Sequence, residues 1–472
     1  MTLNLQTILI ASADLHSQPH VSSGITTLFA VLLLAMIACL AFEEKLHAKK
    51  SLITGIFAVV CLLLGEITGI LPKESIATIG EHTIRLPVYI PAIDWEVIAI
   101  IMGASLFVDV TSKSGIFSWI AIKLTKASGG DPLKLLIYYG ILTVVFSAVL
   151  NNVTAMIIIG SLTTVSLKKL GRSDKLLGFL ITEGLLTNIG GLLTLISSVP
   201  NIIVGNRAGI SFVTFFLKAA PFVVVATFAT LWLARTLFGV KRLDTAGAKE
   251  EAAARVASFD ENEGIPSKRF FITSAVAFAL LIAALSTTSI LPYIKDLGMG
   301  FVAMSFAVFM LIAFKHEVNK FYAALDWDLL GFFASLFVVI NVMEHALVLD
   351  AVGKALGALL DLGDTLGTGS LLVTSALASS VTDNIPLSAV LAQILGNHDP
   401  AYPATSPVWW AVVFGANLGG NLTPIGSAST LVAMTVIHRS EIKLSFGGFV
   451  KAALPFALVH LVLAVAYVLI VL

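Results

Sequence analysis

The sequence predicts an all-α membrane protein with many spans, built from two related halves. Three observations lead to this prediction. Hydrophobic residues make up 57% of the 472 residues and charged residues only 12%, whereas soluble proteins carry about 25% charged residues. Short polar motifs recur at a fixed separation along the chain, and basic residues gather in alternate loops. Each observation is taken in turn below.

The internal repeat is visible in two pairs of motifs. The Asp-Trp pair at residues 94–95 recurs at residues 326–327, and Asn151-Asn152 matches Asp383-Asn384, in both cases 232 residues further on. Equal offsets are hard to obtain by chance. Paired polar breaks in corresponding apolar segments of two halves are the sequence pointer to a transporter's binding site.

The apolar runs give the candidate membrane spans, since a helix needs about 20 apolar residues to cross a bilayer. Two of the runs contain the polar motifs 151–152 and 383–386 in their middle, and we expect each to form a re-entrant helical hairpin. Two other runs are Gly-rich and too long for one helix, and we expect each to unwind in its middle. These two runs also match each other, with residues 187–194 corresponding to residues 416–423 at an offset of 229. The runs are 24–42, 51–72, 94–111, 135–167, 176–206, 210–238, 270–288, 298–314, 328–349, 368–396, 407–437 and 447–472.

The basic residues predict the orientation, because Lys and Arg gather in cytoplasmic loops. If both hairpins return to the side from which they came, the inside segments hold 22 Lys and Arg and the outside segments hold 5. This layout places both termini outside the cytoplasmic (inner) membrane, the segment 240–269 inside, and the two halves in opposite orientation. The repeat is therefore predicted to be inverted.

The charged, Ala-rich stretch 240–267 reads as a cytoplasmic linker, part helical, between the halves. We expect scaffold helices and transport segments to alternate along the chain. The predicted divisions are 1–92 (N-terminal tail and scaffold), 93–206 (first transport half), 207–325 (scaffold and linker), 326–438 (second transport half) and 439–472 (C-terminal scaffold helix).

Several classes of function are excluded by composition. The net charge is zero and the pI is about 7.1, which argues against a nucleic-acid partner. Only Cys39 and Cys61 are present, too few for a disulfide framework or a thiolate metal site. No Walker loop, cofactor motif or enzyme motif is found, and no resident metal or cofactor is expected. Residues 1–22 are expected to form a short polar tail and not a cleaved signal.

The breaks supply the candidate site, because a backbone that leaves the helix inside a bilayer needs partners for its N–H and C=O groups. The alternative, that these side chains only cap broken helices, stays open. The predicted substrate-binding residues are Asn151, Asn152, Asn188, Thr194, Ser197, Ser198, Asn384, Asn417, Asn421, Thr423 and Ser427. The predicted helix-breaking residues are Gly190, Gly191, Pro200, Pro386, Gly419, Gly420, Pro424 and Gly426.

Asp383 is the predicted proton-coupling residue. An acid inside a membrane segment costs about 3 kcal/mol and is functional by default. Neither predicted hairpin contains a Lys or Arg that could neutralise it. For the deeper Glu183, a function and a local hydrogen bond are both left open. Trp409 and Trp410 are expected in an interfacial aromatic belt.

Three motifs resemble those of the ion transporter superfamily: residues 375–386 (SALASSVTDNIP), residues 414–426 (FGANLGGNLTPIG), and Thr187-Asn-Ile-Gly-Gly followed by Pro200-Asn201. The most similar branch holds arsenite efflux permeases, sodium/proton antiporters and the melanosomal P protein. The resemblance covers roughly residues 25–470. It implies a scaffold domain, a mobile transport domain with two hairpins meeting at mid-membrane, and elevator-type alternating access. Many members of the superfamily are homodimers.

Departures from that branch guide the choice of substrate. The first hairpin has Asn151-Asn152 where the P-protein branch has Asp-Asn, and residues 197–201 lack the acid of a Gly-Asp-Pro-Pro-Asn segment. Fewer acids favour a neutral hydroxide over bare Na⁺. The sequence therefore predicts proton-coupled efflux of arsenite or antimonite. Alternatives are a Na⁺/H⁺ antiporter and an anion or dicarboxylate permease, although Asp383 argues against an anion. Protons, a small inorganic substrate and the bilayer are the expected partners, and a homodimer and a soluble ATPase partner stay open.

Overall fold

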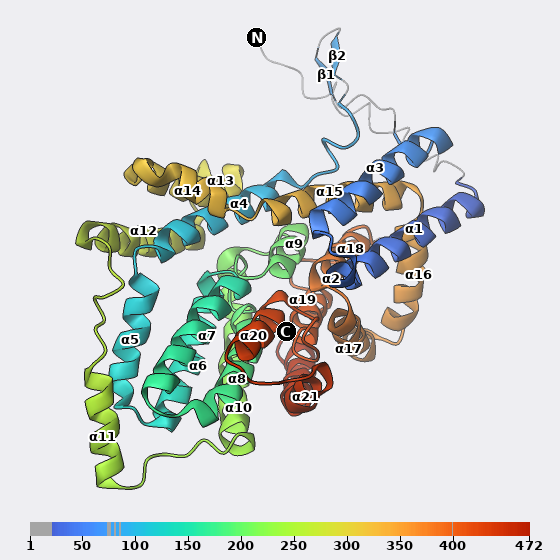
Figure 1. The fold of residues 1–472 in the computed structure, drawn as a ribbon. Coiled ribbons are helices and arrows are strands. Elements are labelled where there is room, and N and C mark those ends of the chain that lie inside the picture. Colours follow the sequence, from blue (N-terminus) through green and yellow to red (C-terminus); the bar gives the residue numbers. More distant parts are fainter. Residues whose placement is uncertain (1–20, 73–76, 80–81, 85, 399) are drawn as a thin grey trace.

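The computed structural model describes residues 21–72, 77–79, 82–84, 86–398 and 400–472, and these are almost entirely helical (Figure 1). The predicted N-terminal tail 1–22 lies outside the described residues except for its last two. One antiparallel strand pair, β1 (Ala77–Ile79) and β2 (His82–Ile84), places Thr78 opposite Thr83. The all-α prediction is wrong for this pair, whose Thr and Ile residues favour strands.

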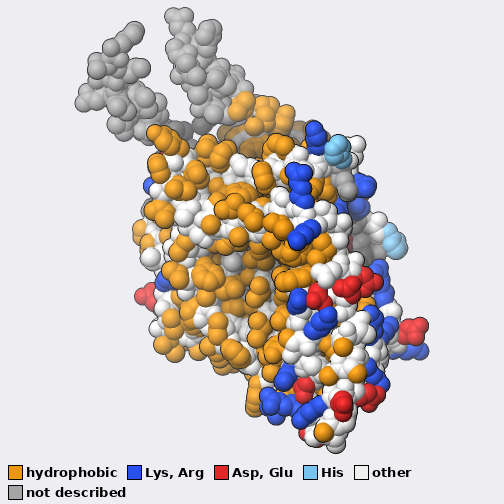
Figure 2. All heavy atoms as spheres, turned by 90° about the vertical axis from the view of Figure 1, so that its left-hand side faces the viewer, with side chains coloured by type: hydrophobic (Ala, Val, Ile, Leu, Met, Phe, Trp, Pro, Cys, Tyr) orange, Lys and Arg blue, Asp and Glu red, His pale blue; other side chains and the backbone are white. Residues whose placement is uncertain are grey.

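Nine helices in the described part of the chain are long and apolar enough to cross a membrane. Many of their side chains are apolar and exposed; Ile67, for example, is 78% exposed. Figure 2 shows a broad apolar face with charged side chains gathered toward one edge and the lower end. The nine are α1 (Ser23–Ala41), α3 (Lys50–Thr68), α4 (Trp95–Ser112), α6 (Pro132–Val149), α10 (Phe212–Leu237), α12 (Lys268–Thr287), α13 (Ile294–Ala313), α15 (Trp327–His345) and α21 (Phe446–Ile470).

The remaining helices are shorter or less apolar and include those that flank the predicted breaks. Two 3₁₀ turns, Ser173–Lys175 and Lys315–Glu317, connect some of them. The remaining helices are α2 (Glu43–Leu46), α5 (Ile116–Ser128), α7 (Asn152–Lys169), α8 (Leu176–Gly190), α9 (Val199–Ala208), α11 (Ala246–Ala257), α14 (Val318–Ala324), α16 (Val348–Leu360), α17 (Asp364–Val381), α18 (Asn384–Gly396), α19 (Pro407–Gly419) and α20 (Ala428–Arg439).

The two halves cross each other through their long helices. Helix α13 of the second half packs along α4 of the first, and α3 of the first packs along α15 of the second. These four form a layer across the top of Figure 1, with α5 to α10 and α17 to α21 below it. The motif pair at 94–95 and 326–327 begins α4 and α15.

Equivalent contacts hold this layer together in both halves. The indole N–H of Trp95 donates to the carbonyl of Ile90 at 3.1 Å, and that of Trp327 donates to Tyr322 at 3.0 Å. One residue further on, the Glu96 carboxylate accepts the Met299 N–H at 3.2 Å. Likewise, the carboxylate of Asp328 accepts the Ser51 N–H at 3.2 Å. Each half thus holds the start of a helix in the other through contacts at matching positions.

The linker is helical in part, as predicted, and α11 lies beside α5 (Figure 1). Arg255 donates to the carbonyl of Leu170 at 2.8 Å, and Lys169 lies 4.6 Å from the ring centre of Phe259. Glu261 forms ion pairs with α5, described below. The linker is therefore bound along the first half instead of hanging free.

The prediction of an interfacial belt at Trp409 and Trp410 is wrong. Their side chains are 2% and 1% exposed, and neither indole N–H has a hydrogen-bond partner among the described residues. Helix α19 packs against α17, α18, α9 and α21, so that it lies inside the helix bundle. An apolar sequence with two Trp residues does not distinguish an interfacial helix from one enclosed by other helices.

Candidate functional site

Two tight polar turns form the centre of the candidate site. Helix α6 ends at Val149 and α7 begins at Asn152, while α17 ends at Val381 and α18 begins at Asn384. Asn151 caps α7 by accepting the Thr154 N–H at 2.7 Å. Asp383 caps α18 by accepting the Ile385 N–H at 3.0 Å. Both turns therefore contain the helix caps that the alternative to a binding role expects.

The two Gly-rich runs are also broken, as predicted. Helix α8 stops at Gly190 and α9 starts at Val199, and α19 stops at Gly419 and α20 starts at Ala428. Glycine is needed at both helix ends because the backbone of a neighbouring helix lies against them. A Cβ at Gly190 would lie 2.6 Å from the Val144 carbonyl oxygen, and one at Gly419 would overlap the carbonyl oxygen of Ala376.

The other predicted helix breakers also act through the backbone and through close packing. A Cβ at Gly191 would lie 2.6 Å from the Asn152 amide, and one at Gly420 would lie 2.8 Å from the Ser427 Cβ. Gly426 lies against Gly420, the Pro424 carbonyl accepts the Thr430 hydroxyl at 3.0 Å, and Pro386 is buried in the first turn of α18.

One cavity of about 420 Å³ contains both polar turns and both breaks. It lies where α7, α9, α18 and α20 begin and is closed on another side by α3, α4 and α15. Of the predicted site residues, Asn151, Asn152, Ser197, Ser198, Pro200, Asp383, Asn384 and Ser427 line it. Polar residues outside the predicted site also line it: Lys50, Ser105, Asp109, Ser112, Thr154, Asp326, Asp328 and Ser429.

Four helices point their N-terminal ends into this cavity. Residues 152–154 of α7, 199–200 of α9, 384–385 of α18 and 428–429 of α20 are all in its wall. Each helix start carries about half a positive charge on its free N–H groups. Side chains cap α7, α18 and α20, but the start of α9 has no side-chain cap. The cavity is therefore suited to a negatively charged group.

Lys50 gives Asp383 a basic partner from outside both predicted hairpins. Its ammonium forms an ion pair and hydrogen bond with the Asp383 carboxylate, and lies 3.8 Å from Glu43. The side chains of Lys50 and Asp383 are 27% and 16% exposed. Lys50 starts α3, outside both predicted hairpins, and in the sequence it looks like the last residue of a cytoplasmic basic cluster. Only the packing of α3 on α15 brings it to the turn.

The other carboxylates in the wall also have partners among the described residues. Asp109 pairs with Lys113 at 2.9 Å, Asp326 caps α15 through the Leu329 N–H at 2.9 Å, and Asp328 accepts the Ser51 hydroxyl at 2.5 Å. Their negative charge is directed toward donors of the protein. They line the cavity together with the helix starts and the uncharged Asn and Ser groups.

The remaining predicted site residues form a buried seam behind the cavity. Ser198 donates to the Asn417 side chain at 2.7 Å, and Asn188 donates to Ser427 at 3.0 Å, so that each half binds the other. Two matching bonds lie within the halves. Thr194 donates to the carbonyl of Ala148, and Thr423 donates to that of Ser380, both at 2.5 Å. Asn188, Thr194, Asn417, Asn421 and Thr423 are not in the cavity wall.

A chain of buried side chains leads from this seam to helix α10. Asn188 donates to the Asn421 oxygen at 2.9 Å, so the Asn421 amide nitrogen, 3.3 Å from His460 Nδ1, donates to that ring atom. The Nε2–H of His460 then donates to Thr230 at 2.7 Å, while the Thr230 hydroxyl donates to the Ala226 carbonyl. These donors fix His460 as a neutral ring.

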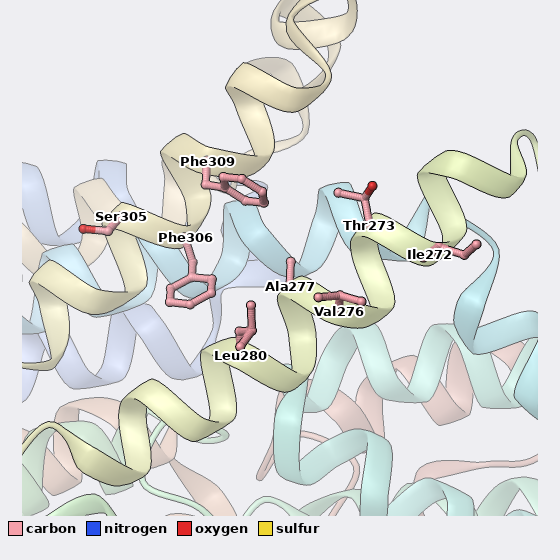
Figure 3. A pocket seen from close by; sticks show the side chains of 8 residues that line it. All are labelled: Ile272, Thr273, Val276, Ala277, Leu280, Ser305, Phe306 and Phe309. Carbon is pink, nitrogen blue, oxygen red and sulfur yellow. The ribbon is translucent and has the colours of Figure 1, made fainter.

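A second cavity lies elsewhere and has a different character. It is about 470 Å³ and lies between α12 and α13, with Val276, Leu280 and Phe306 pointing into the groove (Figure 3). Thr273 and Ser305 are its only polar lining residues among those described, and it holds no charged side chain. It offers nothing that would bind a polar solute.

The fold and the site together define the class of protein. Broken helices that enclose a polar cavity within a bundle of apolar helices are the arrangement of a membrane transporter. The chain belongs to the CitMHS citrate transporter family, whose model matches residues 31–415. It is a transporter and not an enzyme.

Relatives and solved structures agree with this assignment. The chain is 31% identical to an uncharacterized transporter of Mycobacterium tuberculosis, over 79% of this chain and 86% of that protein. It is 24% identical to the human P protein, over 91% of this chain and 60% of that protein. The resemblance to the P protein is thereby confirmed. The arsenite permease and antiporter parts of that resemblance remain predictions.

In structure, the chain is similar to the YdaH transporter of Alcanivorax borkumensis, with a TM-score of 0.58 at 15% identity over 89% of this chain and 98% of that one. It is also similar to MtrF of Neisseria gonorrhoeae, described as one of a class of antimetabolite efflux pumps, with a TM-score of 0.50 at 12% identity over 95% of each chain. These similarities show the fold: a polytopic helical membrane transporter.

Proposed function

We propose that the chain is a secondary transporter of a small organic anion of the carboxylate class to which citrate belongs. The observation that carries the proposal is the convergence of four helix starts and Lys50 on one cavity of about 420 Å³. This choice replaces arsenite efflux as the main hypothesis. Neutral arsenite carries no negative charge for a cationic side chain or a helix start to bind.

The Lys50 pair removes the argument that Asp383 would repel an anion. While Lys50 holds the Asp383 carboxylate, the two charges offset each other. A carboxylate substrate that reaches the cavity can then bind the backbone N–H of Val199 at the start of α9, which has no side-chain cap, and Asn and Ser side chains of the wall. Charge-assisted hydrogen bonds of this kind are shorter and stronger than neutral ones.

The transport cycle we propose follows the predicted arrangement. The turns at 150–151 and 382–383 act as re-entrant tips at mid-membrane, and the two broken helix pairs move past the layer of α3, α4, α13 and α15 in an elevator motion. In this cycle, release of Asp383 from Lys50 frees the carboxylate to bind a proton. Both turns contribute to one cavity, which supports this reading.

The experiment is transport by the purified chain in proteoliposomes under an imposed pH gradient. Labelled citrate, arsenite and Na⁺ are offered in parallel. We expect saturable citrate flux that responds to the gradient, and no flux of arsenite. Arsenite or Na⁺ flux in vesicles that do not move citrate would refute the proposal.

A matched pair of variants tests the site itself. Lys50→Gln leaves the Asp383 carboxylate uncompensated in the cavity, and we expect the apparent KM for citrate to rise on the order of tenfold, since two like charges close together repel by about 1 to 4 kcal/mol. Lys123→Gln removes a lysine whose partner is Glu261, outside the cavity, and should leave the KM unchanged. Equal behaviour of the two variants would remove Lys50 from the site.

A further inference from the structure

A buried polar cluster lies inside the first half, away from the cavity. Glu183 on α8 is 1% exposed and accepts the Thr163 hydroxyl of α7 at 2.5 Å. Next to this pair, the Tyr139 hydroxyl of α6 bonds Ser166 of α7 at 2.8 Å and Thr125 of α5 at 2.6 Å. None of these five residues is in the cavity wall.

Glu183 has no charged partner among the described residues. Its Oε1 accepts the Thr163 bond, and its Oε2 has no hydrogen-bond partner there. The helices packed on α8 are α6, α7, α10, α19, α20 and α21. The titratable and charged residues that these helices carry are Lys134, Tyr138 and Tyr139 on α6, Lys168 and Lys169 at the end of α7, Lys218 and Arg235 on α10, His438 and Arg439 at the end of α20, and Lys451, His460 and Tyr467 on α21.

His460 does not serve as the partner of Glu183, because both of its ring nitrogens bond Asn421 and Thr230. An ionised Glu183 would therefore be an unpaired buried charge. Such a charge inside a membrane segment costs about 3 kcal/mol. A protonated carboxyl group carries no such cost. The surroundings of Glu183 therefore favour the protonated carboxyl group over the ionised carboxylate.

The second half shows that the fold does not need this cluster. The repeat offset is 232 residues for α6 and α7 and 229 residues for α8. The equivalent of Tyr139 in the second half is therefore Leu371, that of Thr163 is Leu395 and that of Glu183 is Val412. All three are apolar and no more than 1% exposed. The same helix arrangement packs there without polar groups. Glu183 and Thr163 are thus additions that packing does not explain.

We infer that Glu183 is a second proton-binding site, which takes up and releases one proton in each transport cycle, with Thr163 orienting its carboxyl group. The O–H bond forms at Oε2 with a proton from water and breaks when that proton returns to water in another conformation; no other atom is transferred. The coupling to transport rests on the proposed function, but the binding of the proton does not. A second proton carrier is useful because Asp383 lies paired with Lys50 inside the substrate cavity.

The transport test uses the full chain in proteoliposomes with Glu183→Gln, which keeps the shape of the side chain and an acceptor for Thr163. We expect citrate counterflow without a gradient to continue and the acceleration of uptake by a pH gradient to be lost. Glu250→Gln, on the exposed surface of α11, is the matched control and should behave as the wild type in both assays. Gradient-driven uptake by Glu183→Gln at the wild-type rate would overturn the inference.

An infrared test separates this inference from the identity of the substrate. In purified protein at neutral pH we expect the C=O stretching band of a protonated carboxylic acid, which Glu183→Gln loses and Glu250→Gln keeps. If citrate is not transported but this band behaves as expected, the proposed function fails and the proton site stands. A band unaffected by Glu183→Gln overturns the site. Should that variant not fold, Thr163→Val tests the same point, since loss of its hydrogen bond must shift the frequency of the band.

Discussion

The two polar turns occupy equivalent places in the two halves, yet only one of them is charged. Asn151 and Asp383 cap their helices in the same way, and the hydroxyls of Ser147 and Ser379 donate to the equivalent carbonyls of Thr187 and Ala416, both at 2.6 Å. Of the two turns in the described residues, only the one at Asp383 has an ion pair with Lys50. The shared contacts maintain the broken helices, and the charge is the feature that the two turns do not share.

The largest expected effect comes from breaking what the halves share. Gly190→Ala and Gly419→Ala each place a methyl group against a backbone carbonyl of the neighbouring helix. We expect each to lower the free energy of unfolding by about 1 to 3 kcal/mol, the usual cost of overpacking. Urea or thermal unfolding of the purified protein measures this effect.

The control for these variants is Gly357→Ala in α16, where nothing lies within 4 Å of the new Cβ. Because Ala favours a helix over Gly by up to about 1 kcal/mol, this variant should be neutral or stabilising. If only one of the two tight glycines proved sensitive, the two breaks would not be structurally equivalent.

Exchanging the capping residues of the two turns should have a smaller effect on stability but a larger effect on transport. Asp383→Asn leaves Lys50 without its partner and should cost about 1 to 2 kcal/mol, less than a fully buried pair because both side chains reach solvent. We expect it to abolish proton coupling while leaving expression intact. Gradient-driven citrate uptake measures the loss.

The reciprocal variant Asn151→Asp keeps the cap, since Asp and Asn cap helices equally well, so stability should change by less than about 0.5 kcal/mol. Its extra negative charge in the cavity should raise the KM for an anion. Wild-type coupling in Asp383→Asn would mean that this carboxylate is not the coupling acid. A lowered KM in Asn151→Asp would point to a cationic substrate.

The helix breaks were predictable from the sequence because short local motifs determine them. The turns at Asn151 and Asp383 and the ends of α8 and α19 at Gly190 and Gly419 follow from polar or Gly residues inside apolar runs, and the repeat offsets place them in pairs. The strand pair at residues 77–84 escaped prediction because three residues per strand give too short a pattern.

The residues that line the cavity were predictable only in part. Asn151, Asn384 and Ser427 line it as expected, but Asn188 and Asn417 lie in the seam behind it. The sequence does not tell on which side of a helix break a polar group points. Lys50 was missed because it is 333 residues from Asp383, and only the packing of the two halves joins them. The burial of Trp409 was missed for the same reason.

The smallest expected effect concerns the linker, which is bound to the first half only. Hydrogen bonds from Lys123 and Lys126 lower the pKa of Glu261 from 4.5 to about 2. A carboxyl whose pKa is lower in the folded protein stabilises it above the unfolded pKa, and loses that contribution as the pH falls through the folded pKa. The melting temperature of the wild type should therefore exceed that of Glu261→Gln above about pH 4.5, and the two should converge toward about pH 2. The difference should be small and weaken in salt, because the pair is at the surface. A difference that grew on acidification would mean that these lysines do not hold Glu261, and that the linker is bound to the first half through Arg255 and Phe259 instead.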